Sequence, residues 1–136
     1  MKTVAPLVLL VDDFEDIRAM YAEYLTLAGY RVVEASDGRQ ALARAVELLP
    51  NLLVMDLSLP VLDGWATLRE LRSDVRTEGI PVIVLTGHAR AGYSRRARDA
   101  GFASFLTKPC MPAVLWTVVR DVLARAHSST GKKSAT

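Results

Sequence analysis

Four side chains that could do chemistry follow directly after short apolar runs of the sequence. Asp12 and Asp13 come after LVLLV, Asp56 comes after LLVM, and Lys108 comes after SFLT. Carboxylates held close together repel one another unless a cation joins them. Oxygen ligands suit a hard divalent ion, and Mg²⁺ needs only a few protein carboxylates because it keeps several waters. The pattern therefore predicts a magnesium site beside a lysine, if these runs are neighbouring strands.

A fifth polar residue, Thr86, ends the run PVIVLT and would add a hydroxyl donor. A metal ion, an ammonium group and a hydroxyl together suit an oxyanion such as a phosphoryl group, whose transfer is catalysed mainly by positioning and charge neutralisation. No Ser, Cys or His stands at a strand end as nucleophile, whereas a carboxylate can form an aspartyl-phosphate. Asp56 is the natural candidate, because its strand should lie centrally.

The elements that must position these residues alternate along the chain. Short Val-, Leu- and Ile-rich runs predict strands, and apolar residues spaced three and four apart predict helices. Continuous apolar strands suit a parallel sheet covered on both faces, and ligands of such doubly wound α/β sheets sit at the carboxyl ends of the strands. The predicted strands are 7–11, 31–35, 52–56, 81–86 and 104–107, and the predicted helices are 15–29, 37–49, 63–74, 93–101 and 111–126.

Composition limits the class of protein. The formal charge of +2 corresponds to Lys132 and Lys133, so the remaining 15 basic and 15 acidic residues balance. A balanced domain gives no electrostatic reason to bind nucleic acid or a membrane. One cysteine excludes an internal disulfide, and no apolar run approaches the roughly 20 residues that span a bilayer, which favours a cytoplasmic protein. We expect one domain over residues 1–126 and a disordered polar tail over 127–136.

At these residues the chain closely resembles the receiver domain of two-component response regulators, the CheY-like family. Five pieces match in order, and the resemblance runs from about Val4 to Ala126. It implies a flavodoxin-like (βα)5 fold with strand order 2-1-3-4-5. The matching pieces are VDD (11–13), DGRQAL (37–42), MDLSLPVLDG (55–64), VLTGHA (84–89) and DAGFASFLTKP (99–109).

The resemblance also implies roles for the acidic residues. Asp56 matches the phosphoacceptor. Asp13 and Asp56 match direct ligands of Mg²⁺, joined by the backbone carbonyl of Ser58, and Asp12 matches the acid that holds the metal through water. The phosphoryl group would come from a phosphohistidine on a histidine kinase or a histidine phosphotransfer protein.

Other matching residues concern the phosphorylated state. Thr86 and Lys108 match the phosphate-binding pair, and Phe105 matches the aromatic that turns inward when the threonine moves. The Lys108–Pro109 bond matches one that is usually cis. Phosphorylation would then bias the face made by the fourth helix, fifth strand and fifth helix toward an output protein or a second copy. Ser58 and His88 flank the attacking water in this family, and we expect them to set the lifetime of the phosphorylated form.

Several alternatives stay open at this point. Asp12 and Asp13 could simply cap the first helix, and Phe105 could be a core residue. Trp116 falls off the apolar stripe of its helix, and an exposed aromatic beside basic residues is an alternative to a simply solvated face that would suggest a docking interface. The leading hypothesis is a signalling module and not an enzyme. It would be a stand-alone regulator or a receiver cut from a hybrid kinase or multidomain regulator.

Two further classes of protein compete with the signalling module. A phosphatase of the haloacid-dehalogenase type also uses an aspartyl-phosphate, but such enzymes have a second acid two residues after the nucleophile. That position is Ser58 in this chain. A flavin carrier shares the fold, but its first loop needs a phosphate cradle, and two acids there would repel phosphate.

Overall fold

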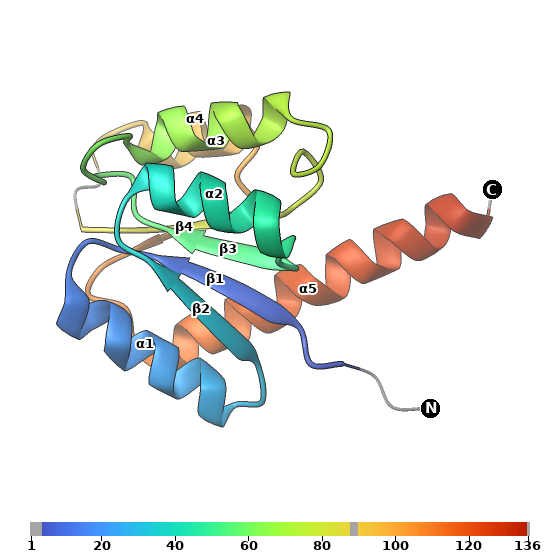
Figure 1. Ribbon diagram of the computed structural model, residues 1–136, viewed down its shortest axis with the longest axis horizontal. Coiled ribbons are helices and arrows are strands. Elements are labelled where there is room, and N and C mark those ends of the chain that lie inside the picture. Colours follow the sequence, from blue (N-terminus) through green and yellow to red (C-terminus); the bar gives the residue numbers. More distant parts are fainter. Residues whose placement is uncertain (1–3, 88–89, 136) are drawn as a thin grey trace.

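The computed structural model of the protein describes residues 4–87 and 90–135, with side chains described as far as residue 126. Strands and helices alternate along the chain, as the apolar runs predict (Figure 1). The strands are β1 (Leu7–Val11), β2 (Arg31–Ala35), β3 (Leu52–Met55), β4 (Val82–Thr86) and β5 (Ser104–Thr107). The helices are α1 (Glu15–Leu27), α2 (Gly38–Leu48), α3 (Gly64–Ser73), α4 (Tyr93–Ala100) and α5 (Pro112–Ala135).

The five strands form one parallel sheet in the order β2-β1-β3-β4-β5, which confirms the expected flavodoxin-like topology. β3 lies at the centre, between β1 and β4, and all four of its residues are fully buried. Successive residues of a strand face opposite sides of the sheet, and here both sides are covered. The residues of a central strand such as β3 are therefore all apolar, and such strands appear in the sequence as continuous apolar runs. The central place of β3 puts Asp56, the residue after it, at the middle of the carboxyl edge.

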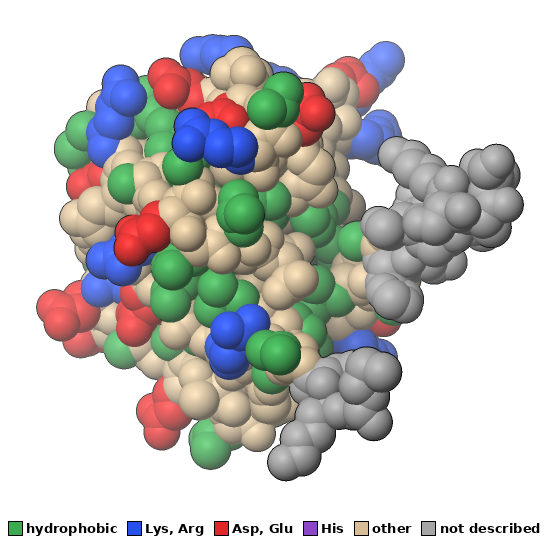
Figure 2. Space-filling model, turned by 45° about the vertical axis from the view of Figure 1, so that its right-hand side comes forward, with side chains coloured by type: hydrophobic (Ala, Val, Ile, Leu, Met, Phe, Trp, Pro, Cys, Tyr) green, Lys and Arg blue, Asp and Glu red, His purple; other side chains and the backbone are tan. Residues whose placement is uncertain are grey.

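Helices cover both faces of the sheet. One face packs against α2, α3 and α4, and the other packs against α1 and α5. Alternate residues of a strand point to opposite faces, so Leu53 and Met55 belong to the first core and Leu52 and Val54 to the second. Both cores are dominated by side chains with little or no exposure, whereas charged side chains of both signs lie scattered over the surface, as Figure 2 shows for one face.

Local sequence fixes the helix ends. The side chain of Asp37 accepts a hydrogen bond from the backbone N–H of Gln40 and caps α2, and Asp63 caps α3 in the same way through Ala66. Gly29, with φ of +107°, follows the end of α1.

Helix α5 extends through residues 127–135, which the sequence predicts to be a disordered tail. The side chains of that stretch lie outside the described part, so the disorder of the tail stays a prediction. None of the helices within the described residues is both long and apolar enough to cross a bilayer.

Trp116 is less exposed than its place off the apolar stripe of α5 suggests. It is half-buried and packs against the core that α1 and α5 share, and it lines an open hollow of about 340 Å³ together with Tyr24 and Leu27 of α1. Arg120 lies over its ring, with the guanidinium carbon 5.0 Å from the ring centroid.

Candidate functional site

Three acidic residues meet at the carboxyl edge of the sheet. Asp12 directly follows β1 and Asp56 directly follows β3, and because these strands are neighbours their ends lie side by side. Asp12 and Asp56 are 4% and 5% exposed, whereas Asp13 points to the surface. Each of the three offers a carboxylate oxygen within 4.8 Å of the others. The predicted convergence of the acids is therefore present.

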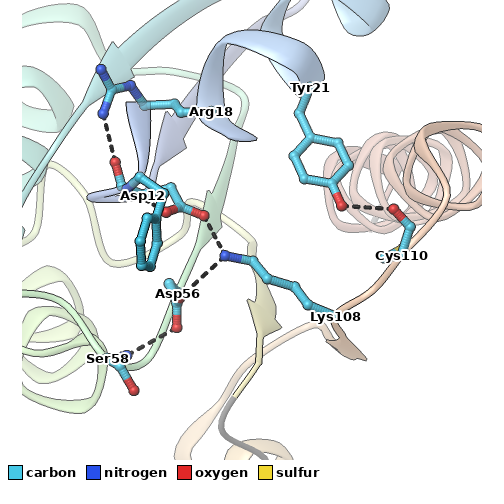
Figure 3. A network of polar contacts seen from close by, with 8 residues as sticks. Asp12, Arg18, Tyr21, Asp56, Ser58, Lys108 and Cys110 are labelled. Carbon is cyan, nitrogen blue, oxygen red and sulfur yellow. Dashed lines mark hydrogen bonds and ion pairs between the residues drawn. The ribbon is translucent and has the colours of Figure 1, made fainter. Parts of the chain in front are cut away.

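Lys108 joins the acids from the end of β5. Its Nζ lies 2.5 Å from Oδ2 of Asp12 and 3.1 Å from Oδ2 of Asp56, as Figure 3 shows. Burial lowers the pKa of Lys108, but the hydrogen bond to Asp12 and the nearby carboxylate charges raise that pKa by more, so that it lies above its usual value. The lysine is therefore a fixed positive charge in the pocket. The Lys108–Pro109 peptide bond is cis, as the resemblance implies.

Each buried acid is also held by the backbone that follows it. Oδ1 of Asp12 accepts a hydrogen bond from the N–H of Phe14 at 2.9 Å, and Oδ1 of Asp56 accepts one from the N–H of Ser58 at 3.0 Å. Both carboxylates thus turn Oδ2 toward Lys108. Neither Asp12 nor Asp13 is the N-cap residue of α1, which is Phe14, although Asp12 accepts the N–H of Phe14 at the start of that helix.

The site can hold a hard divalent cation. Its donors are all carboxylate oxygens, two of them are buried and oriented, and the exposed Asp13 leaves one side of the cluster open to water. Mg²⁺ prefers such a set, with a few protein oxygens and several waters. A bound Mg²⁺ would neutralise the repulsion among the acids and the charge of an incoming phosphoryl group.

The other predicted site residues lie in different settings. Thr86 is fully buried at the end of β4, and its carbonyl accepts the N–H of Lys108 at 2.8 Å. Phe105 is half-buried in β5 and lines a hollow of about 220 Å³ between α4 and β5. Ser58 is exposed and lies two residues after Asp56. His88 lies outside the described residues. The roles of these four residues stay predictions.

Two residues of α1 support the site and were not recognised from the sequence. Nη1 of Arg18 donates to the backbone carbonyl of Asp12 at 2.7 Å, while its Nε pairs with Glu34 at 2.9 Å. The hydroxyl of Tyr21 donates to the backbone carbonyl of Cys110 at 2.6 Å. In the sequence Tyr21 is one of the apolar-face residues of a helix, and nothing there indicates a partner 89 positions away.

Comparison with known proteins agrees with this geometry. The response regulator receiver domain profile matches residues 8–120, which is most of the chain. The chain belongs to the response regulator receiver family. Receiver domains are modules of two-component signalling, and the fold and the acidic edge described above are accounted for by that membership.

Several curated relatives of this receiver domain are transcriptional regulators. The chain is 38% identical over 120 residues to the DNA-binding dual master transcriptional regulator RpaA of Synechocystis, covering 88% of this chain and 50% of RpaA. It is 42% identical over 119 residues to the transcriptional activator ExaE of Pseudomonas putida, covering 86% of this chain and 55% of ExaE. The receiver chain thus spans about half the length of these relatives.

Solved receiver structures superpose closely on it. A CheY-like receiver protein from Methanospirillum hungatei gives a TM-score of 0.86 at 26% identity, covering 92% of this chain and 98% of that one. The receiver domain of a sensor histidine kinase from Pseudomonas aeruginosa gives 0.80 at 32% identity, covering 88% and 98%. That structure holds a magnesium ion coordinated in the active site cleft.

Proposed function

We propose that this receiver domain accepts a phosphoryl group on Asp56 from a phosphohistidine of a histidine kinase or a phosphotransfer protein, in a Mg²⁺-dependent reaction. One observation carries the proposal. Three acid oxygens converge within 4.8 Å, and Lys108 bridges the two buried acids at 2.5 and 3.1 Å. A cluster with this charge pattern suits a cation and a phosphoryl group.

The reaction follows from the positions of the side chains. A carboxylate oxygen of Asp56 attacks phosphorus, the bond from phosphorus to the histidine nitrogen breaks, and the histidine leaves with the bonding electron pair. The N–H of Ser58 holds the other oxygen of Asp56, so the nucleophile is presented in one orientation. Lys108 compensates the charge of the transferred group. Asp12 and Asp13 would hold Mg²⁺ with Asp56, and the carbonyl of Ser58 would be a further ligand.

Phosphorylation would act on the rest of the domain through Thr86 and Phe105. The added group carries about −1.5 to −2 charges, which favours movement of a hydroxyl donor toward it. Phe105 is half-buried beside the hollow of about 220 Å³ against α4, so space for a change of its position exists. The affected face, α4, β5 and α5, would then bind an output protein or a second copy of the chain. Ser58 and His88 would set the lifetime of the phosphorylated form.

A phosphate-transfer assay with a small donor tests the proposal. The chain is incubated with acetyl phosphate, with and without Mg²⁺, and its intact mass is measured. We expect one phosphoryl group on the wild type and on Asp63→Asn, a control that changes an exposed acid outside the pocket. We expect none on Asp56→Asn and none without the metal. Phosphorylation of Asp56→Asn, or equal phosphorylation of the wild type with and without Mg²⁺, would contradict the proposal.

A further inference from the structure

Tyr21 connects helix α1 to the segment that carries Lys108. Its side chain is 3% exposed, and its hydroxyl donates to the carbonyl of Cys110 at 2.6 Å (Figure 3). Cys110 stands two residues after Lys108, between β5 and α5. A hydrogen bond of this length between a buried hydroxyl and a backbone carbonyl fixes the carbonyl in place.

In the segment from Lys108 to Met111 only Cys110 packs against the core, and the two neighbours of Cys110 are exposed. Pro109 is exposed and Met111 is 70% exposed. On the side of α1 the segment borders an open hollow of about 410 Å³, lined by Ile17, Met20, Tyr21, Lys108, Pro109 and Cys110. At its start the N–H of Lys108 donates to Thr86 at 2.8 Å, and near its end the carbonyl of Cys110 is held by Tyr21. These two hydrogen bonds tether the segment, in addition to the core packing of the Cys110 side chain and the bonds that the Met111 carbonyl accepts from the first turn of α5.

The tether matters because Lys108 must place one atom accurately. Its Nζ contacts Asp12 and Asp56 from the end of a long, flexible side chain, so the position of its backbone sets which geometries it can reach. Tyr21 remains a donor under ordinary conditions, since burial and then the neighbouring Cys110 raise the pKa of its hydroxyl above the usual 10.0.

We infer that Tyr21 is a positioning residue for phosphoryl transfer, acting through Lys108, which adds to the proposed function and rests on it. The hydroxyl holds the segment between β5 and α5 and thereby holds the ammonium group opposite Asp56. The ring has a separate role, because it packs in the core between the sheet, α1 and α5. Removal of the oxygen alone separates the two roles.

The first test compares Tyr21→Phe with the wild type and with Tyr24→Phe. Tyr24 lies three residues further along α1 and its ring is exposed, so its hydroxyl is a matched control. With acetyl phosphate and Mg²⁺ we expect Tyr21→Phe to label about three- to tenfold more slowly, since a misplaced catalytic group lowers the rate, and Tyr24→Phe to match the wild type. An unchanged rate for Tyr21→Phe would overturn the inference.

A double-mutant cycle separates positioning from a general structural effect. In a Lys108→Ala background, whose slow labelling is followed over a long incubation, Tyr21→Phe should cause no further loss of rate. If Tyr21→Phe slows labelling by the same factor with and without Lys108, the hydroxyl does not act through the lysine and the inference is wrong.

Hydrogen exchange tests the tether without any phosphoryl transfer. The N–H of Lys108 should exchange several-fold faster in Tyr21→Phe than in Tyr24→Phe, because the segment is released at its other end. Equal exchange would refute the tether. If the wild type accepts no phosphoryl group, the proposed function fails, while the exchange result still decides whether Tyr21 holds the segment.

Discussion

Gly64 at the start of α3 lies directly against the backbone of Asp56. A Cβ atom built on Gly64 would be 2.5 Å from the carbonyl oxygen of Asp56 and 2.7 Å from the Cα of Leu57. The N–H of Gly64 donates to the carbonyl of Leu57 at 2.9 Å, which brings the two segments together. The helix that follows the acceptor loop thus packs on the acceptor residue itself, and only a residue without a side chain fits.

Gly64→Ala should therefore destabilise the domain and disturb the site. We expect a loss of about 1–3 kcal/mol in the free energy of unfolding, since backbone must move to admit the methyl group. Gly79→Ala is the matched control, because nothing lies within 4 Å of its Cβ position. Urea denaturation measures both variants. Equal stabilities for Gly64→Ala and Gly79→Ala would show that the contact is not tight.

Removal of the cap of α3 should cost less. The carboxylate of Asp63 accepts the N–H of Ala66 at 2.8 Å, so Asp63→Ala should lower the free energy of unfolding by about 1 kcal/mol. Asp63→Asn keeps an oxygen acceptor and should lose only a few tenths of that amount. The same urea titration compares the two variants. A loss as large in Asp63→Asn as in Asp63→Ala would point to charge and not to capping.

The central strand should be the most sensitive part of the core. Leu53 is fully buried in β3, and Leu53→Ala should cost about 2–5 kcal/mol because it removes apolar contacts and leaves a cavity. Leu27 at the end of α1 is 82% exposed, so Leu27→Ala should change stability by about 0.5 kcal/mol or less. Thermal and urea unfolding measure both. A small effect at Leu53 would mean that the core readily closes the cavity.

Alkaline pH should destabilise the fold through Cys110 and Tyr21. Burial raises the pKa of the Cys110 thiol above its usual 9.0. Burial, and after it the charge of the nearby Cys110 thiolate, raises the pKa of the Tyr21 hydroxyl above its usual 10.0. The folded state therefore binds protons that the unfolded state releases. The contribution of these two groups to the free energy of unfolding is fully present below their pKa values in the unfolded chain. It is lost as the pH rises through their higher pKa values in the folded chain.

Urea unfolding at a series of pH values from 7.5 upward measures this loss. Cys110→Ala keeps the carbonyl that accepts from Tyr21 but removes the thiol, so its stability should fall less steeply between pH 8 and 10. A slope identical to that of the wild type would contradict the assignment to Cys110.

Local sequence patterns predict the strands, the helix starts and the buried face of most helices. Leu52 to Met55 reads as a strand because both faces of β3 are covered, and Asp37 and Asp63 mark helix starts by local hydrogen bonds. Such features depend on neighbours in the chain or on burial alone. The convergence of Asp12 and Asp56 was also predictable, because parallel strands end at one edge of their sheet.

Individual contacts between distant segments depend on the packing of the folded chain. The sequence predicts that Lys108 lies near the acids, but not that its Nζ contacts Asp12 and Asp56, 96 and 52 positions away, and not that the Tyr21 hydroxyl meets a carbonyl 89 positions away. Trp116 was expected to be exposed and is half-buried, because it packs against the core between α1 and α5. Hydrogen bonds and burial of this kind depend on how helices sit on the sheet within a few tenths of an ångström. Local pattern carries no information at that precision.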